Sequence, residues 1–170
     1  MPISPYVRDL RAHLGTRRLL MPSVAGIVRD PENRVLLVRQ QESGVWSTPG
    51  GVIEMEDSPA DAVVREVWEE TGLVVRPNRI IGVYGGPNFV VVYPNGDETQ
   101  YIAIIFECSI ESGTLRADGD ETIAAQFWTK DDTSRLRLAP WLVRVLPRLF
   151  EASTEAWFER AVWRPTPTAP

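Results

Sequence analysis

The sequence predicts an α+β fold in which a mixed set of strands is layered between helices. Three observations predict this class. The chain has 170 residues, of which 44% are hydrophobic, and this suits one domain with a single substantial core. Short apolar runs separated by turn residues predict strands. Helical patterns stand before, within and after those strands, which favours helices packed on a mixed sheet.

An N-terminal helix is expected over residues 4–14, because Ser4 can cap it, Pro5 suits its first turn and Gly15 can end it. An Asn-Gly pair in the sequence PNGDE predicts a hairpin between two later apolar runs. The apolar runs expected to form strands are residues 19–30, 34–41, 73–75, 79–85, 89–93, 99–110 and 123–128.

The end of the chain is expected to close the fold with two helical segments, residues 140–152 and 153–163. The tail after residue 163 is rich in proline and is expected to be disordered. The aromatic residues of these closing segments suit either core or dimer contacts, so the sequence leaves a homodimer open. The expected organisation is a helical extension over 1–17, a main domain over 18–150, and a C-terminal helix with a proline-rich tail over 151–170.

The charge balance excludes some classes of partner. The net charge is −5, whereas binding to a nucleic-acid polymer needs a basic surface. No apolar run approaches the roughly 20 residues of a membrane span. The single cysteine excludes an internal disulfide, and charged residues Arg8, Asp9 and Arg11 stand where a signal peptide would need apolar ones. We therefore expect a cytoplasmic protein that binds neither membranes nor nucleic-acid polymers.

The best-defined helix is 59–71. Ser58 is a suitable N-terminal cap, and Pro59 suits the first helical position. Asp61 completes a pattern similar to a capping box. Apolar residues recur with helical spacing, so one stripe should be buried, and the glutamates should line the edge of a groove outside the core. The stripe expected to be buried consists of Ala60, Val63, Val64 and Val67.

This helix carries an unusual charge cluster. Glu66, Glu69 and Glu70 are neighbours on a helix, and like charges at this spacing are destabilising. Gly72 ends the helix, so the cluster lies near the negative end of the helix dipole, where Lys or Arg would be favoured. Arg65 can pair with Glu69, but one arginine cannot neutralise three carboxylates. A solvated acidic face is the simpler interpretation, yet a divalent cation such as Mg²⁺ or Mn²⁺ accounts better for the cluster.

The run from Gly51 to Leu73, GVIEMEDSPADAVVREVWEETGL, resembles the Nudix box, G-x5-E-x7-R-E-U-x-E-E-x-G-U with U apolar. The departure from the pattern is Asp57, where the family usually has Glu, and Glu56 occupies a place where Gly is common. The preceding WSTPGG is similar to the usual entry loop of the family. The matching positions are Gly51, Arg65, Glu66, Val67, Glu69, Glu70, Gly72 and Leu73.

The resemblance implies an α/β/α sandwich with a mixed central sheet and metal-dependent hydrolysis of a nucleoside diphosphate linked to another group. It implies that Arg65 orients a glutamate and that Asp57 supports Arg65. It also implies a set of ligands for Mg²⁺ or Mn²⁺, namely Glu66, Glu69, Glu70 and the carbonyl of Gly50.

Hydrolysis of a phosphoanhydride also needs a base for the attacking water. In the family the base is either a box glutamate, here Glu69, or an acid from a later loop. Glu121 in DGDET is the loop candidate, and its plain alternative is a solvated turn residue. Asp118 and Asp120 are weaker candidates.

The substrate stays open among a nucleotide sugar such as ADP-ribose, a nucleoside triphosphate and a dinucleoside polyphosphate. The first alternative function is a non-catalytic module that binds a nucleotide, although such modules usually lose box glutamates. The second is an isopentenyl-type isomerase, which would need a catalytic cysteine, whereas Cys108 lies in an apolar strand. Trp46 could stack on a nucleobase, but a tryptophan before PGG more often packs the loop in place.

Overall fold

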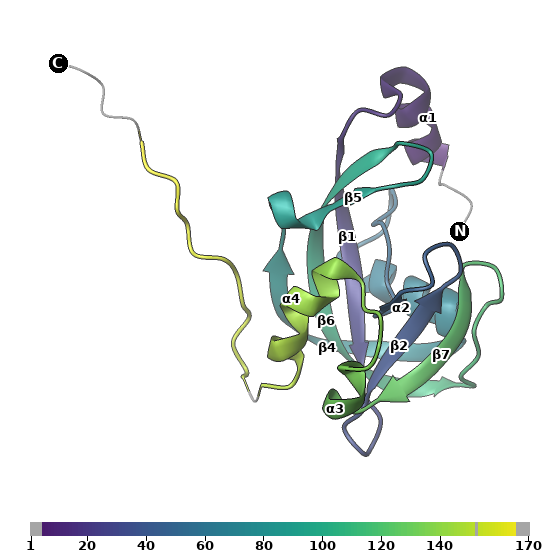
Figure 1. Cartoon of the computed structure of the whole chain (residues 1–170). Helices are drawn as coiled ribbons and strands as arrows, with labels where there is room; N and C mark the ends of the chain where they lie inside the picture. The colour runs from purple at the N-terminus through teal and green to yellow at the C-terminus, as the bar shows by residue number, and fades with distance from the viewer. Residues whose placement is uncertain (1–4, 152, 166–170) are drawn as a thin grey trace.

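The computed structural model describes residues 5–151 and 153–165 and confirms the α+β class (Figure 1). The helices are α1 (Pro5–Leu14), α2 (Pro59–Thr71), α3 (Lys130–Thr133) and α4 (Pro140–Leu149), with a short 3-10 turn, η1 (Pro87–Phe89). The strands are β1 (Leu19–Val28), β2 (Val35–Gln40), β3 (Trp46–Ser47), β4 (Leu73–Tyr84), β5 (Val90–Val92), β6 (Glu98–Gly113) and β7 (Thr122–Trp128).

The strands form two sheets. In the mixed four-stranded sheet, β6 is the centre: it pairs in parallel with β1 and antiparallel with β4 and β5. The Asn-Gly hairpin is confirmed, since β5 and β6 flank a turn in which the Gly96 N–H bonds the Tyr93 carbonyl. The second sheet is antiparallel, in the order β3-β2-β7. The two predicted strands 73–75 and 79–85 join into β4, which tolerates Pro77 because it is an edge strand.

Helices α2 and α4 pack on opposite sides of the mixed sheet, so the predicted sandwich is confirmed. Successive residues of β1 point to opposite faces. Ala25 and Ile27 belong to the core cluster that includes α4, whereas Val24 and Val28 belong to the cluster that includes α2. All four are at most 3% exposed, so this half of β1 is buried on both faces.

Strand β1 approaches α2 closely at one glycine. A Cβ atom on Gly26 would lie 2.7 Å from Val67 Cγ2 and 3.3 Å from Val63 Cγ2. Both valines are fully buried on α2, so neither can turn away into solvent. The missing side chain therefore sets how near the acidic helix lies to the sheet.

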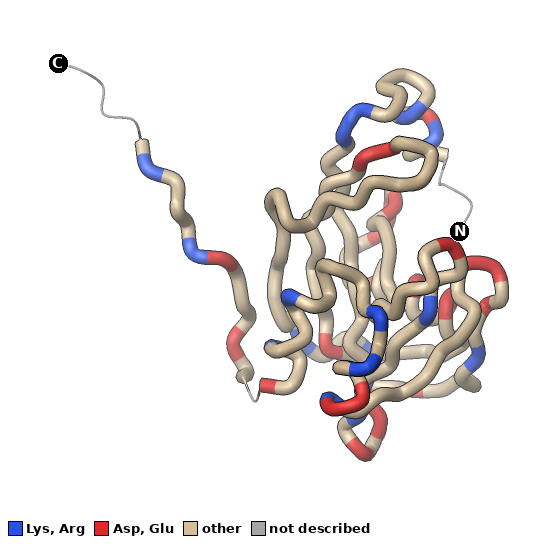
Figure 2. Tube along the Cα trace, in the orientation of Figure 1, with Lys and Arg blue, Asp and Glu red and all other residues tan. Residues whose placement is uncertain are grey.

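The N-terminal helix lies at one end of the molecule, against the β5–β6 turn. Arg11 donates to the Glu98 carbonyl and to Thr99 Oγ1 and forms an ion pair with Asp97 at 3.4 Å. Figure 2 shows the basic residues of this segment beside that acidic turn. The predicted helix over residues 4–14 is confirmed from Pro5 onward, and the cap predicted at Ser4 lies outside the described residues.

The C-terminal helix predicted over 153–163 is wrong, because the described residues of this segment form no helix. Trp157 instead bonds the free edge of β4: its N–H donates to the Ile81 carbonyl, and its carbonyl accepts from the Val83 N–H. Its ring stacks on Tyr84 with centroids 4.6 Å apart. An edge strand offers unpaired backbone groups, and these contacts outweigh the weak helical preference of a short segment. The predicted disorder of the tail falls mainly on residues 166–170, outside the described residues.

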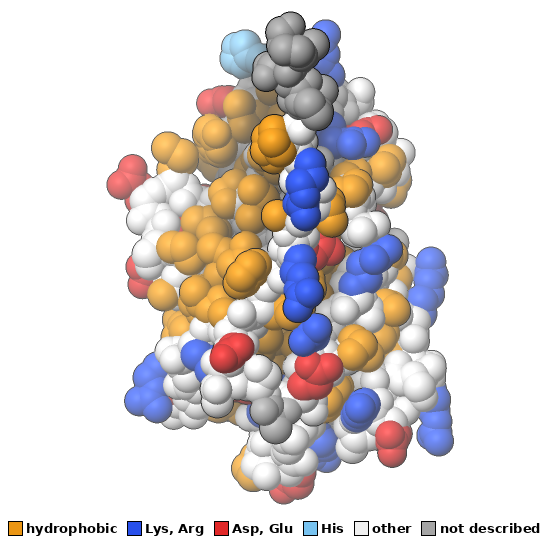
Figure 3. All heavy atoms as spheres, turned by 90° about the vertical axis from the view of Figure 1, so that its left-hand side faces the viewer, with side chains coloured by type: hydrophobic (Ala, Val, Ile, Leu, Met, Phe, Trp, Pro, Cys, Tyr) orange, Lys and Arg blue, Asp and Glu red, His pale blue; other side chains and the backbone are white. Residues whose placement is uncertain are grey.

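One face of the molecule gathers apolar side chains beside the C-terminal segment (Figure 3). The exposed apolar residues on the strands of the mixed sheet include Leu20, Val83 and Ile102, with exposed fractions of 61%, 41% and 41%. The homodimer that the sequence left open stays a prediction. Among the described residues, each helix is too short or too polar to cross a bilayer.

We predict that Gly26→Ala lowers the free energy of unfolding by about 1–3 kcal/mol, because the new methyl group must displace Val67 and Val63. Gly85→Ala is the matched control, since a Cβ there would have 3.6 Å to its nearest neighbour. Urea denaturation of both variants measures the difference. Equal stability of the two variants would contradict the close approach.

Candidate active site

Helix α2 begins and ends where its local sequence predicts. The Ser58 hydroxyl accepts a hydrogen bond from the Asp61 N–H at 3.1 Å, and Pro59 follows in the first turn. At the other end Gly72 adopts the left-handed conformation with φ of 70°, and its N–H bonds the Trp68 carbonyl. These caps fix the register of the helix, and with it the direction in which each glutamate points.

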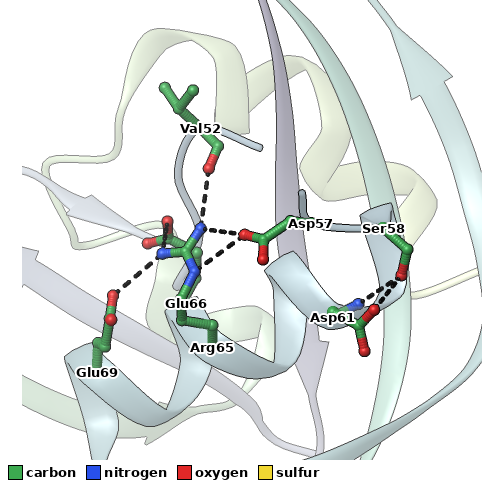
Figure 4. A network of polar contacts seen from close by, with 7 residues as sticks. All are labelled: Val52, Asp57, Ser58, Asp61, Arg65, Glu66 and Glu69. Atoms are coloured by element: carbon green, nitrogen blue, oxygen red, sulfur yellow. Dashed lines mark hydrogen bonds and ion pairs between the residues drawn. The ribbon is translucent and has the colours of Figure 1, made fainter. Parts of the chain in front are cut away.

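Arg65 is the centre of the polar network in Figure 4. Its Nη1 lies 2.8 Å from Glu66 Oε1 and 3.2 Å from Glu69 Oε2, so it bridges two of the three clustered carboxylates. Its Nε and Nη2 both bind Asp57 Oδ2, at 3.1 and 2.9 Å, and Nη2 also donates to the Val52 carbonyl. Asp57 thus reaches Arg65 although its side chain is shorter than the family's Glu. Burial acts to lower the pKa of Arg65, but the hydrogen bonds and charges of its partners raise it overall.

Glu66 is more buried than its sequence pattern predicted. It is 0% exposed, so the prediction that all three glutamates line a groove edge is wrong for this residue. Burial raises the pKa of Glu66 to about 7, although the charge of Arg65 opposes the rise. Glu66 Oε2 has no hydrogen-bond partner among the described residues. A buried carboxylate oxygen without a partner needs a proton or a cation.

The glycines of the entry loop make room for these carboxylates. A Cβ on Gly51 would lie 2.6 Å from Glu66 Oε2, and a Cβ on Gly50 would collide with the Val24 carbonyl. The Gly50 N–H donates to Glu70 Oε2 at 3.3 Å. Glu70 is 8% exposed, and burial, followed by the charges of nearby carboxylates, raises its pKa well above the ordinary value. Glu70 is therefore mostly buried, although part of its side chain still reaches the groove that the glutamates were predicted to line.

The predicted buried stripe is only partly correct. Val63 and Val67 are fully buried, whereas Ala60 is exposed and Val64 is half-buried. Ala62 and Thr71 are buried in their place. The buried face is thus turned toward Glu66 and Glu70, because the sheet and the entry loop cover this side of α2.

The loop between β6 and β7 brings Glu121 to the helix. Asp118 Oδ1 accepts from the backbone N–H groups of Asp120, Glu121 and Thr122, at 2.6, 2.9 and 3.1 Å. The Thr122 hydroxyl donates to the Glu70 carbonyl at 3.1 Å. Asp118 therefore orders the turn that carries Glu121, and Thr122 fastens the turn to the end of α2.

A groove of about 830 Å³ runs along this side of α2. Four predicted site residues, Arg65, Glu69, Glu70 and Glu121, line it together, whereas Gly50 and Glu66 are not among its lining residues. Trp68 and Arg116 also line the groove, although the sequence pattern did not single them out. A signal for Trp68 was present, since it is a large aromatic residue off the apolar stripe. The lining residues are Pro5, Glu54, Met55, Glu56, Asp57, Arg65, Trp68, Glu69, Glu70, Arg116, Asp118, Asp120 and Glu121.

The donor set suits a hard divalent cation. Carboxylate oxygens are what Mg²⁺ and Mn²⁺ prefer, and Glu66 Oε2 is a buried oxygen with no partner among the described residues. Within the described residues, no three acidic, histidine or cysteine side chains already converge closely enough to hold a metal. Arg65 accounts for part of this, because it occupies one oxygen each of Glu66 and Glu69. The chemistry of these oxygens therefore fits a divalent cation, and Glu66 Oε2 is the one that Arg65 leaves without a partner.

Two other residues have structural roles. Cys108 is 3% exposed, and burial raises the pKa of its thiol to about 12, so it does not suit the nucleophile that an isomerase would need. Trp46 packs edge-on against Trp128 with ring centroids 5.2 Å apart, which agrees with a loop packed in place.

A mixed sheet between helices, with an acidic groove along α2, is the fold of a Nudix hydrolase. The family model for the NUDIX domain matches residues 19–149. The chain belongs to the Nudix family and is a Nudix pyrophosphohydrolase.

Two relatives and one solved structure illustrate the similarity. The chain is 34% identical to a MutT-like protein of Streptomyces ambofaciens, over 75% of each chain. It is also 34% identical to an ADP-ribose pyrophosphatase of Methanocaldococcus jannaschii, over 76% of this chain and 73% of that one. The crystal structure of a MutT protein from Methanosarcina mazei Go1 has a TM-score of 0.65 at 24% identity, covering 78% of this chain and 94% of that chain. At this identity the structural similarity shows the fold alone.

We predict that Glu66→Gln weakens the loss of stability with rising pH in metal-free protein. The pKa of Glu66 is about 7 in the folded protein, above its ordinary value of 4.5, so its ionisation lowers the folding stability as the pH rises through this window. Glutamine cannot ionise, so the variant should gain in melting temperature over wild type between pH 5 and pH 8 in EDTA. The control is Glu69→Gln, which changes the more exposed member of the cluster. If the melting temperatures of wild type and Glu66→Gln fell equally with rising pH, the prediction would be contradicted.

Proposed function

We propose that this protein is a Mg²⁺- or Mn²⁺-dependent hydrolase that cleaves a phosphoanhydride bond in a nucleoside diphosphate linked to another group. One observation carries the proposal: Glu69, Glu70 and Glu121 line the same groove, above a buried Glu66. The side chains come from a helix and from a loop far along the chain. Such convergence is what a site for an anionic substrate and its cation needs.

In this proposal Glu66, Glu69 and Glu70 hold the cation, with the Gly50 carbonyl as a further ligand. When bound, the cation would offset the negative charge of the phosphoryl oxygens and lower the pKa of a bound water. Arg65 holds Glu66 and Glu69 in place through its Nη1. Asp57 holds Arg65 from the opposite side, at 2.9 Å.

Glu121 is the proposed general base. It lies in the groove with Glu69 and Glu70, and the Asp118 side chain orders its turn. Its carbonyl accepts from the Gln41 N–H at 2.7 Å, which ties the turn to the second sheet as well. A base must be held within reach of the water that it deprotonates, and these bonds hold the backbone at Glu121. Glu69 is the alternative base within the helix.

The substrate class rests on the relatives. The names of two similar proteins are ADP-ribose pyrophosphatase and putative 8-oxo-dGTP diphosphatase, at 34% and 33% identity. We propose a nucleotide sugar such as ADP-ribose, a nucleoside triphosphate or a dinucleoside polyphosphate. A groove of about 830 Å³ has room for a ligand of this size.

We predict that Glu69→Gln and Glu70→Gln each reduce turnover by at least ~100-fold, because each removes a charged group that holds the cation. The measurement is Mg²⁺-dependent release of monophosphate or phosphate from a panel of these nucleotides. Glu111→Gln is the matched control, since Glu111 is exposed and pairs with Arg76 outside the groove. Near-wild-type turnover of either groove variant at saturating Mg²⁺ would contradict the assignment of that glutamate to the cation site.

We predict that Glu121→Gln lowers kcat by ~100-fold or more, the usual effect of a lost general base, and leaves Mg²⁺ affinity almost unchanged. Turnover and metal binding are measured on the same variant, the latter by calorimetry. Loss of metal affinity would make Glu121 a ligand. Retention of both properties would move the base to Glu69.

A further inference from the structure

Trp68 presents an aromatic ring to the groove. It lies on α2 between the fully buried Val67 and Glu69, and it is 50% exposed. It lines the groove together with Glu69 and Glu70. The ring contacts among the described residues do not include Trp68, so its face is available to a ligand.

Arg116 is held at the end of the same helix. Its N–H donates to the Thr71 carbonyl at 2.9 Å, which fixes its backbone at the end of α2. Its side chain runs along Gly72, because a Cβ there would lie 3.0 Å from Arg116 Cγ and 3.1 Å from Nε. The Gly72 N–H bonds the Trp68 carbonyl, so the cap lies one turn beyond Trp68 at the end of α2. Arg116 and Trp68 therefore both border the groove near the end of α2.

Arg116 is the arginine of the groove that is available to an anion. Arg65 is committed to Asp57, Glu66 and Glu69. The ion pairs within residues 5–151 and 153–165 do not include Arg116, which also lines the groove and is exposed. Apart from these two arginines, the charged residues of the lining are carboxylates, which repel phosphate. An anionic ligand in the groove is thus drawn to Arg116.

We propose that Trp68 and Arg116 form a subsite for the nucleoside monophosphate half of the substrate. The Trp68 ring stacks on the base, and the Arg116 guanidinium binds the adjacent phosphate. Stacking on an aromatic side chain is possible for every base. Arginine binds phosphate through strong, charge-assisted hydrogen bonds. This inference rests on the proposed function, because it assigns a substrate half to the same groove.

The test is binding of AMP and of ribose 5-phosphate to the Mg²⁺-loaded full chain, measured by isothermal titration calorimetry. Trp68→Ala should weaken AMP binding by about tenfold and leave ribose 5-phosphate unchanged, because only AMP carries a base. Arg116→Gln should weaken both ligands by about tenfold, because both carry phosphate. Trp163→Ala and Arg135→Gln are the matched controls, since these exposed residues lie outside the groove lining.

Unchanged AMP affinity in Trp68→Ala would overturn the stacking role, as would an equal loss for both ligands. Unchanged affinity of both ligands in Arg116→Gln would overturn the phosphate role. Absence of AMP binding to wild type would overturn the subsite, while hydrolysis of another phosphoanhydride could still support the proposed function. If Glu69→Gln kept full turnover but Trp68→Ala lost AMP binding, the catalytic assignment would fail and the subsite would stand.

Discussion

The ion pairs of Arg65 are the interaction on which the candidate site depends. Glu66, Glu69 and Glu70 repel one another and lie near the end of α2 where negative charge is unfavourable. Arg65 offsets this by bridging Glu66 and Glu69 while Asp57 holds its other edge. Without Arg65, the buried Glu66 would face a desolvation cost of several kcal/mol with no compensating charge. The arginine thus lets the acidic helix fold before any cation is bound.

The arginine compensates only part of the cluster. It occupies Oε1 of Glu66, and Oε2 has no partner among the described residues. Burial raises the pKa of Glu66 and of Glu70, so both carboxylates are held in a state that favours a proton or a cation. The buried carboxylates therefore lower the folding stability of the metal-free protein, as functional sites commonly do. A cation that binds only the folded protein would restore it.

The backbone near the site is brought close by glycines. Gly26 allows α2 to pack closely on β1, because it has no side chain to hold Val63 and Val67 away. Gly51 leaves the space that the Glu66 carboxylate fills. The Gly50 N–H completes the arrangement by binding Glu70. Helix, strand and entry loop therefore pack as one unit, and a change in the core at any of these contacts would move the carboxylates. This couples the geometry of the groove to the stability of the fold.

The sequence by itself determined the features that depend on local interactions: the caps of α2, the hairpin at Asn95–Gly96, and the spacing of Arg65 and the glutamates. Only the tertiary structure decided which side of α2 is covered, that Glu66 is buried, that Trp68 and Arg116 border the groove, and that residues 153–163 follow an edge strand. Capping and turn formation involve neighbours in the chain, so a short pattern specifies them. Burial and edge pairing depend on partners far away in sequence, and the relative positions of those partners exist only once the two sheets and the helices have packed.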